Sequence, residues 1–282
     1  MLLLFPLATL AQETTSSLRV DTYTGEGLPA TDVAVTVTDT RTGSSRTSGS
    51  GESGTVTFSG LRVGGPYTVT TSAADFGNQT VTDVFLRLGD TYLLPLSLAT
   101  GAVEEVIVTA TQVQTQQLAL GPASTFGLKE LQDLPAINRD IRDIIRVDPR
   151  IYQDVANQGD IQCAGANPRF NSLTVDGVRF NDNFGLNSNG YPTERQPFPY
   201  DSLEQVAVEL APYDVQYGGF TACNINSVTK SGSNEFFGSL FYDYTNDSMR
   251  GDKLGDDKVD LGNFSEKRYG VSLGGPIIKD KL

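Results

Sequence analysis

Short stretches of alternating apolar and polar residues dominate the first hundred positions of the chain. The run VAVTVTD, Val33 to Asp39, has the alternation of a strand with one buried face. Three further runs continue the pattern, and glycine-rich and polar turns such as RTGSSRTSGSGESG separate the runs: TVTFSGL, PYTVTTSA and TYLLPLSL. Short strands at this spacing predict a small β-sandwich over residues 18–98.

Residues 99–124 contain one further strand-like stretch, EEVIVTAT, which is followed by polar sequence. Its β-branched centre favours extended backbone. Three interpretations are open: a last strand of the sandwich, a first strand of the next domain, or a strand that adds to the sheet edge of another protein. The last is our working hypothesis, and it assigns partner binding to eight residues: Glu104, Glu105, Val106, Ile107, Val108, Thr109, Ala110 and Thr111.

Helical spacing appears after residue 125. Leu128, Leu131 and Leu134 share one helical face, and Pro135 should end that helix. A second helix is expected to begin at Asn138, as its cap. It should bury three isoleucines at helical spacing: Ile141, Ile144 and Ile145.

Strand patterns then return. NSLTVDGVRFND predicts a hairpin with its turn at Asp176 and Gly177, and SLEQVAVELAP predicts a further strand after a long loop at 183–200. Helices and strands together indicate a mixed α/β domain over residues 125–232.

The alternation changes character after residue 233. In EFFGSLFYDYTND, one face carries Leu240, Tyr242 and Tyr244, and the returning stretch KRYGVSLGGPI alternates in the same way. Aromatic residues near strand ends and a long charged loop are typical of a transmembrane β-hairpin, with a soluble hairpin as the alternative. Because two strands cannot close a barrel, we expect residues 233–282 to begin an incomplete barrel and the chain to be a fragment of a longer protein.

Composition lowers the prospects of several function classes. The chain has 21 basic and 34 acidic residues, a net charge of −13, which disfavours nucleic-acid binding. It has no histidine, so the commonest neutral-pH base and metal ligand is missing. We therefore expect no enzyme, and assign no catalytic residue, metal ligand or cofactor.

Two features indicate export. Residues 1–11 resemble a signal peptide, whose missing basic start suggests that the true beginning lies upstream of Met1. The two cysteines, Cys163 and Cys223, lie 60 positions apart and are candidates for a disulfide. Such a bridge would stabilise the fold by on the order of 4 kcal/mol, although spacing alone does not prove the pair.

The order of motifs resembles two known domain families. Three stretches resemble the carboxypeptidase regulatory-like domain: GLPATDVAVTVTDTRTG, SGTVTFSGLRVGGPYTVT and ADFGNQ. Four stretches in order resemble the plug domain of TonB-dependent outer-membrane receptors: LKELQDLPA, VDGVRFND, LEQVAVELAPYDVQYGG and NINSVTKSG. The sandwich and the two cysteine-containing segments are most similar to the Oar-like branch of that family. YGGFTAC departs from the family's usual glycine-rich run at that point.

This resemblance implies a multi-domain, mainly β protein: a transthyretin-like sandwich, an α/β plug, and the first two strands of a truncated transmembrane barrel. It implies the outer membrane of a Gram-negative bacterium, with the sandwich in the periplasm and the plug inside the barrel. EEVIVTAT would be the TonB box, which binds the TonB C-terminal domain and, through it, ExbB and ExbD indirectly. Outer-membrane lipid and an unidentified transported substrate would be the other partners.

The resemblance leaves two alternatives. The chain could instead be a cell-surface adhesion or carbohydrate- or protein-binding scaffold. A loop of the plug could face the substrate or be a plain connection; its candidate residues are Asn183, Phe184, Asn187, Asn189 and Tyr191.

Overall fold

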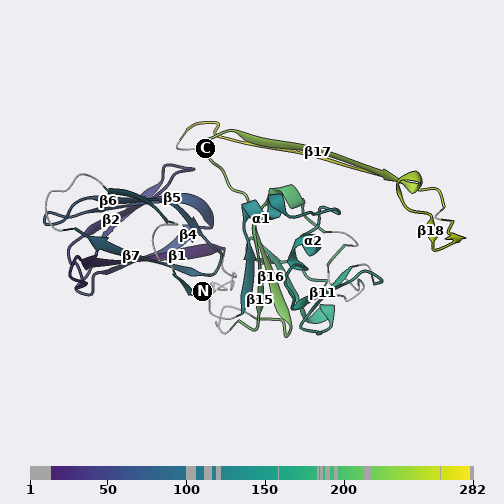
Figure 1. The fold of residues 1–282 in the computed structure, drawn as a ribbon, viewed down its shortest axis with the longest axis horizontal. Coiled ribbons are helices and arrows are strands. Elements are labelled where there is room, and N and C mark those ends of the chain that lie inside the picture. Colours follow the sequence, from purple (N-terminus) through teal and green to yellow (C-terminus); the bar gives the residue numbers. More distant parts are fainter. Residues whose placement is uncertain are drawn as a thin grey trace, which may run out of the picture. The chain divides into compact units, whose positions relative to one another are not determined.

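The computed structural model describes residues 14–99, 106–110, 116–118, 122–157, 159–182, 184, 187, 191–193, 196–212, 218–260 and 262–279. The expected signal peptide at residues 1–11 lies outside these residues. The fold is mainly β, as predicted, and Figure 1 shows its elements. The chain divides into two compact units, Met1–Ser231 and Gly232–Leu282, which are described separately.

The first unit begins with a β-sandwich of two sheets. Their strand orders are β4-β1-β7-β9 and β3-β2-β5-β6-β8. The strands are β1 (Thr15–Thr24), β2 (Ala34–Asp39), β3 (Ser45–Gly49), β4 (Thr55–Arg62), β5 (Gly64–Ser72), β6 (Gln79–Leu86), β7 (Thr91–Leu98), β8 (Val106–Thr109) and β9 (Gln116–Leu118).

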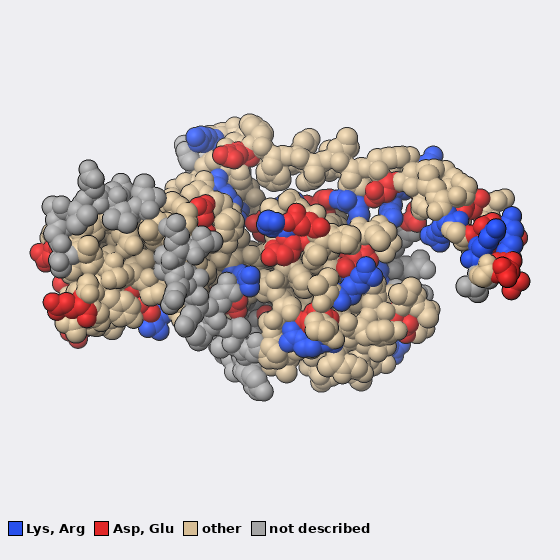
Figure 2. Space-filling view, viewed as in Figure 1, with Lys and Arg blue, Asp and Glu red and all other residues tan. Residues whose placement is uncertain are grey.

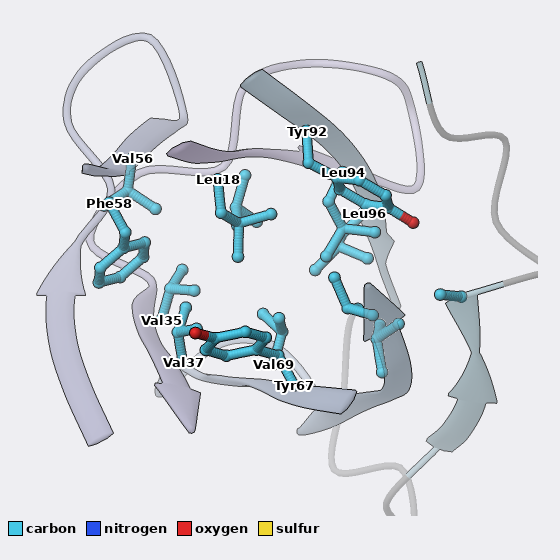
Figure 3. Packing of buried hydrophobic residues seen from close by; sticks show 14 of the residues in the cluster. Leu18, Val35, Val37, Val56, Phe58, Tyr67, Val69, Tyr92, Leu94 and Leu96 are labelled. Atoms are coloured by element: carbon cyan, nitrogen blue, oxygen red, sulfur yellow. The ribbon is translucent and has the colours of Figure 1, made fainter. Parts of the chain in front are cut away.

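Apolar side chains from both sheets meet between them and form the sandwich core (Figure 3). Leu18 and Leu94 come from one sheet and Val35 and Val69 from the other, and all four are fully buried. Each lies on a strand whose burial alternates along the chain. The sandwich predicted from alternation is therefore confirmed.

One part of that prediction was wrong. Residues 45–49 were expected in a loop, but they form β3, which pairs antiparallel with β2. All five residues of β3 are exposed, so its polar composition carries no alternation. Backbone pairing holds it in place, together with side-chain contacts such as the 2.8 Å hydrogen bond between the Thr36 and Thr47 hydroxyls.

The plug follows the sandwich in the same unit. Its central sheet has the order β10-β15-β16-β13-β14, and β11 and β12 form a separate hairpin. The elements are β10 (Ala123–Phe126), α1 (Leu128–Asp133), α2 (Ile141–Ile145), β11 (Ile151–Asp154), β12 (Asp160–Cys163), η2 (Pro168–Phe170), β13 (Ser172–Val175), β14 (Val178–Arg179), η3 (Tyr200–Ser202), β15 (Leu203–Leu210) and β16 (Cys223–Thr229). Within the described residues, no helix has the length and apolar character needed to cross a membrane.

The two predicted helices form, with one correction. Helix α1 ends before Pro135, and the three isoleucines of α2 are fully buried. The cap of α2, however, is Asp140 and not Asn138. The Asp140 carboxylate accepts the Arg142 N–H at 2.9 Å, whereas the Asn138 N–H donates to Asp143 Oδ2 at 2.7 Å.

The sandwich and the plug contact each other through the start of β15. Gln205 Oε1 accepts the Leu88 N–H at 3.0 Å, and Gln205 Nε2 donates to the Leu86 carbonyl at 2.9 Å. Both hydrogen bonds are buried. A small apolar cluster unites side chains of the two domains: Val63, Leu88, Ala207 and Val228.

The second unit is a long hairpin of β17 (Phe237–Asn246) and β20 (Ser265–Gly274), with η4 (Asp247–Met249), β18 (Lys253–Leu254) and β19 (Asp257–Lys258) in its loop. The register places Leu240 opposite Val271 and Tyr242 opposite Tyr269. Leu240, Tyr242, Tyr269 and Val271 thus share one face, and Leu240 is 82% exposed. Figure 2 shows side chains of both charges gathered at the loop end of this unit.

Candidate functional site

The candidate partner-binding segment is centred on β8. In the structure β8 pairs in parallel with β6, from Gln79 opposite Val106 to Thr82 opposite Thr109. It is the last described strand of its sheet. The structure thus shows Val106–Thr109 as a strand of the sandwich, one of the three interpretations left open. Glu104, Glu105 and Thr111 lie outside the described residues, and the TonB-box assignment remains a prediction.

Side chains as well as backbone hold this segment on the sandwich. Val108 packs against the sandwich core, and Ala110, 5% exposed, belongs to it. Pairing with β6 ends beside Asp83, which has a φ of 59° and lies where the pairing of β6 with β5 shifts register. A left-handed residue of this kind bends a strand, which accounts for the end of the β6–β8 ladder at Thr109.

The segment leads directly into the plug. Strand β9 pairs with β7 of the other sandwich sheet, and β10 pairs antiparallel with β15 of the plug. Strand β10 lies at the edge of the plug sheet, and the carbonyl of Pro122 accepts the Leu210 N–H at 2.9 Å. Strand β10 is thus the first strand of the plug, and β9 lies between it and β8 along the chain.

A charged group fixes β10 to the rest of the plug. The Ser124 hydroxyl donates to Asp148 Oδ2 at 2.5 Å, and Arg150 donates to the same carboxylate and to the Ser124 oxygen. The hydrogen bond from Arg150 holds the pKa of the buried Asp148 carboxyl well below its usual range. The sequence analysis did not identify this group, although the Asp-Pro-Arg run marks where α2 ends.

The candidate substrate-facing residues divide into different environments. Phe184 is 89% exposed, and the Asn187 side chain donates to the Tyr191 carbonyl at 3.0 Å. Tyr191 itself is 3% exposed and packs in the plug core with the Arg142 guanidinium 5.2 Å from its ring centre. Burial raises the pKa of its phenol well above the ordinary value.

Tyr191 is therefore a core side chain in this structure, and its candidate role toward a substrate remains a prediction. Its loop has too few apolar residues for the sequence pattern to show this burial. Asn183 and Asn189 lie outside the described residues, so their candidate roles remain predictions.

Cys163 and Cys223 form a disulfide in the structure, and both are buried. Cys163 ends β12 and Cys223 begins β16. The bridge therefore joins the β11–β12 hairpin to a central strand of the plug sheet.

Asp176 has a structural role, as expected. Asp176 and Gly177, with φ values of 49° and 78°, form the turn between β13 and β14. The Asp176 carboxylate also accepts the N–H and the hydroxyl of Thr229, at 2.9 and 2.7 Å. It therefore joins the turn to the end of β16.

Comparison with protein families gives three matches along the chain. Residues 17–99 match the carboxypeptidase regulatory-like domain, and residues 115–223 match the TonB-dependent receptor plug domain. Residues 115–223 are thus similar to the plug of TonB-dependent receptors. Residues 228–282 match an outer membrane β-barrel domain. The family resemblance is thereby confirmed, and these matches indicate the outer membrane of a Gram-negative bacterium.

Three individual proteins are similar to parts of the chain. The TonB-dependent transporter Oar of Myxococcus xanthus is 35% identical over 124 residues, 40% of this chain and 11% of the transporter. Among solved structures, the outer membrane transporter YddB from Escherichia coli has a TM-score of 0.42 at 18% identity, and covers 53% of this chain. The siderophore receptor PirA from Acinetobacter baumannii has a TM-score of 0.43 at 24% identity and covers 57%. The chain spans 23% of each of these two receptors and 11% of Oar.

Proposed function

We propose that the chain is the N-terminal part of a TonB-dependent outer-membrane transporter whose plug gates the passage of a substrate. The carrying observation is the order of parts: a sandwich, a short edge strand, a plug matched to the TonB-dependent family, and an exposed apolar hairpin matched to a barrel. The sandwich lies in the periplasm and the plug inside the barrel.

In this proposal, residues Glu104 to Thr111 bind the TonB C-terminal domain as an added strand. A short β-branched strand suits this mode, because backbone hydrogen bonds supply affinity and alternate side chains supply specificity. TonB carries energy from the inner-membrane ExbB and ExbD proteins, which therefore act on this chain indirectly. Tension on the segment passes through β9 and then reaches β10, which is the first strand of the plug and lies at the edge of its sheet.

Opening the plug in this way makes and breaks no covalent bond. The process replaces hydrogen bonds between β10 and β15, and the contacts of Ser124 with Asp148 and Arg150, by contacts with water. We therefore infer that the protein works as a transporter and not as an enzyme.

A binding experiment with the purified TonB C-terminal domain tests the proposal. Residues 104–111 of the full chain are replaced by a glycine-serine segment of equal length, and affinity is measured by calorimetry. As a matched control, the eight residues 252–259 in the exposed loop of the hairpin unit are replaced in the same way. We expect binding to be lost in the first variant and kept in the second.

Binding that survives replacement of residues 104–111 would show that the TonB-box assignment is wrong. Absence of binding in the unmodified chain, together with surface display in cells that lack TonB, would instead favour the adhesion scaffold. The TonB-box assignment and the transport function are therefore refuted by different results.

A further inference from the structure

Strand β8 is part of the sandwich in the structure, so a partner that binds it meets a strand that is already paired. Four residues of β8 are paired with Gln79–Thr82 of β6. In a parallel ladder, these bonds occupy the backbone groups on one edge of β8. A partner strand that adds to that edge must first displace β6.

Two side chains of the segment also pack on the sandwich. Val108 is partly buried against the sandwich core, and Ala110 is a member of that core. A side chain buried in the sandwich is not available to a pocket on a partner. Strand β9 extends the other sheet beyond β7, so the chain is docked on both sides of residues 111–115.

We propose that the β6 edge of the sandwich is a docking surface for the chain's own TonB-box segment, and that it competes with TonB for this segment. The proposal rests on the proposed function, which supplies the identity of the partner. Apparent affinity falls in proportion to the fraction of molecules in the undocked, binding-competent state. The carboxypeptidase regulatory-like domain thereby regulates how readily the transporter engages the energy source.

A reversible crosslink tests this competition. Thr82 and Thr109 are aligned partners in the ladder, and both are half-buried. Adjacent strands lie about 4.8 Å apart, which falls in the range of Cα separations that a disulfide spans. The double variant T82C/T109C, in the full chain, should therefore form a disulfide under mild oxidation that locks β8 on β6.

The readout is affinity for the TonB C-terminal domain before and after reduction. We expect the oxidised variant to bind at least about tenfold more weakly than the reduced variant. The TonB domain should also slow crosslinking of the reduced variant, because binding and docking exclude each other. The control T36C/T47C crosslinks β2 to β3 at an aligned pair away from β8 and should leave affinity unchanged. It also accounts for reduction of the native Cys163–Cys223 bridge, which both variants share.

Each outcome decides a separate question. Equal affinity in the oxidised and reduced states would overturn the competition and show that TonB adds to the outer edge of a docked β8. Failure of T82C/T109C to crosslink, while T36C/T47C crosslinks, would overturn the docking itself. If T109C alone weakens binding, the pair T80C/I107C at another aligned position of the ladder repeats the test. Failure of the proposed function is distinct, because it requires binding to survive replacement of residues 104–111.

Discussion

Replacing Gln205 by leucine removes the two hydrogen bonds that join the sandwich to the plug while keeping the volume of the side chain similar. In the native structure, the Gln205 amide accepts from the Leu88 N–H at 3.0 Å and donates to the Leu86 carbonyl at 2.9 Å. The leucine would leave both backbone groups buried without these partners. Each orphaned group costs about 1–3 kcal/mol, so the two together cost about 2–6 kcal/mol.

Some of this cost is recovered. The introduced leucine would lie beside the apolar cluster that contains Leu88 and Ala207, where added apolar burial contributes about 1–2 kcal/mol. Subtracting the low ends and the high ends of the two ranges from each other gives a net loss of about 1–4 kcal/mol. For a unit of this size, each kcal/mol lowers the midpoint of thermal unfolding by roughly 2–4 °C.

Urea unfolding and hydrogen exchange measure the two parts of this prediction. The unfolding free energy should fall by the net amount above, and a peptide that spans Leu86 to Leu88 should exchange its amides faster. The matched control is Gln132→Leu, since Gln132 is exposed on α1. An unfolding free energy within about 0.5 kcal/mol of this control, with unchanged exchange at Leu88, would refute the role given to Gln205.

Three further predictions follow from the plug and the hairpin. Asp148→Asn should lower the free energy of unfolding at pH 7 by about 1–3 kcal/mol. In the wild type, the stability that this carboxylate contributes should be present above pH ~4 and lost as pH falls through its depressed folded-state pKa. Acid titration of both proteins checks this, and parallel stability curves would contradict it. Unreduced chain should show no mass increase with a thiol-alkylating reagent under denaturing conditions, whereas alkylation of Cys163 or Cys223 would exclude the disulfide. In the full-length receptor, Leu240→Arg should cost about 2–4 kcal/mol of barrel stability because the side chain at position 240 faces lipid. Ser239→Arg, on the other face of the strand, should be tolerated. Equal effects of the two variants in heat-modifiability gels would argue against this orientation.

Period-2 alternation predicted the sandwich because its strands bury one face each. The same rule failed for β3, whose five residues are all exposed. A strand held mainly by backbone pairing carries no apolar signal, so residues 45–49 look like a loop in sequence. Strand β15 lacks alternation for the opposite reason. Almost every one of its residues is buried, because the strand is covered on both faces.

Polar residues that join distant parts of the chain were the least predictable. Gln205 lies between Leu203 and Val206 in a strand pattern, and nothing local indicates that its amide pairs with residues 117 and 119 positions away. Likewise, Asn138 and Asp140 are both good helix caps, and the choice depends on which side-chain oxygen reaches the Arg142 N–H. Such choices are made by tertiary packing and not by local propensity.

The sequence of the partner-binding segment predicts a strand but does not say which strand it pairs with. Its β-branched residues predict extended backbone in any environment, so they are equally suited to β6 and to the sheet of another protein. A segment with two suitable partners is a switch only if neither pairing is overwhelmingly stable. The four aligned pairs, ended by the left-handed Asp83, give β8 a short ladder that binding energy from a partner can exceed. Lengthening the ladder should therefore weaken engagement of TonB, and this follows from the bend in β6 and not from the segment's own sequence.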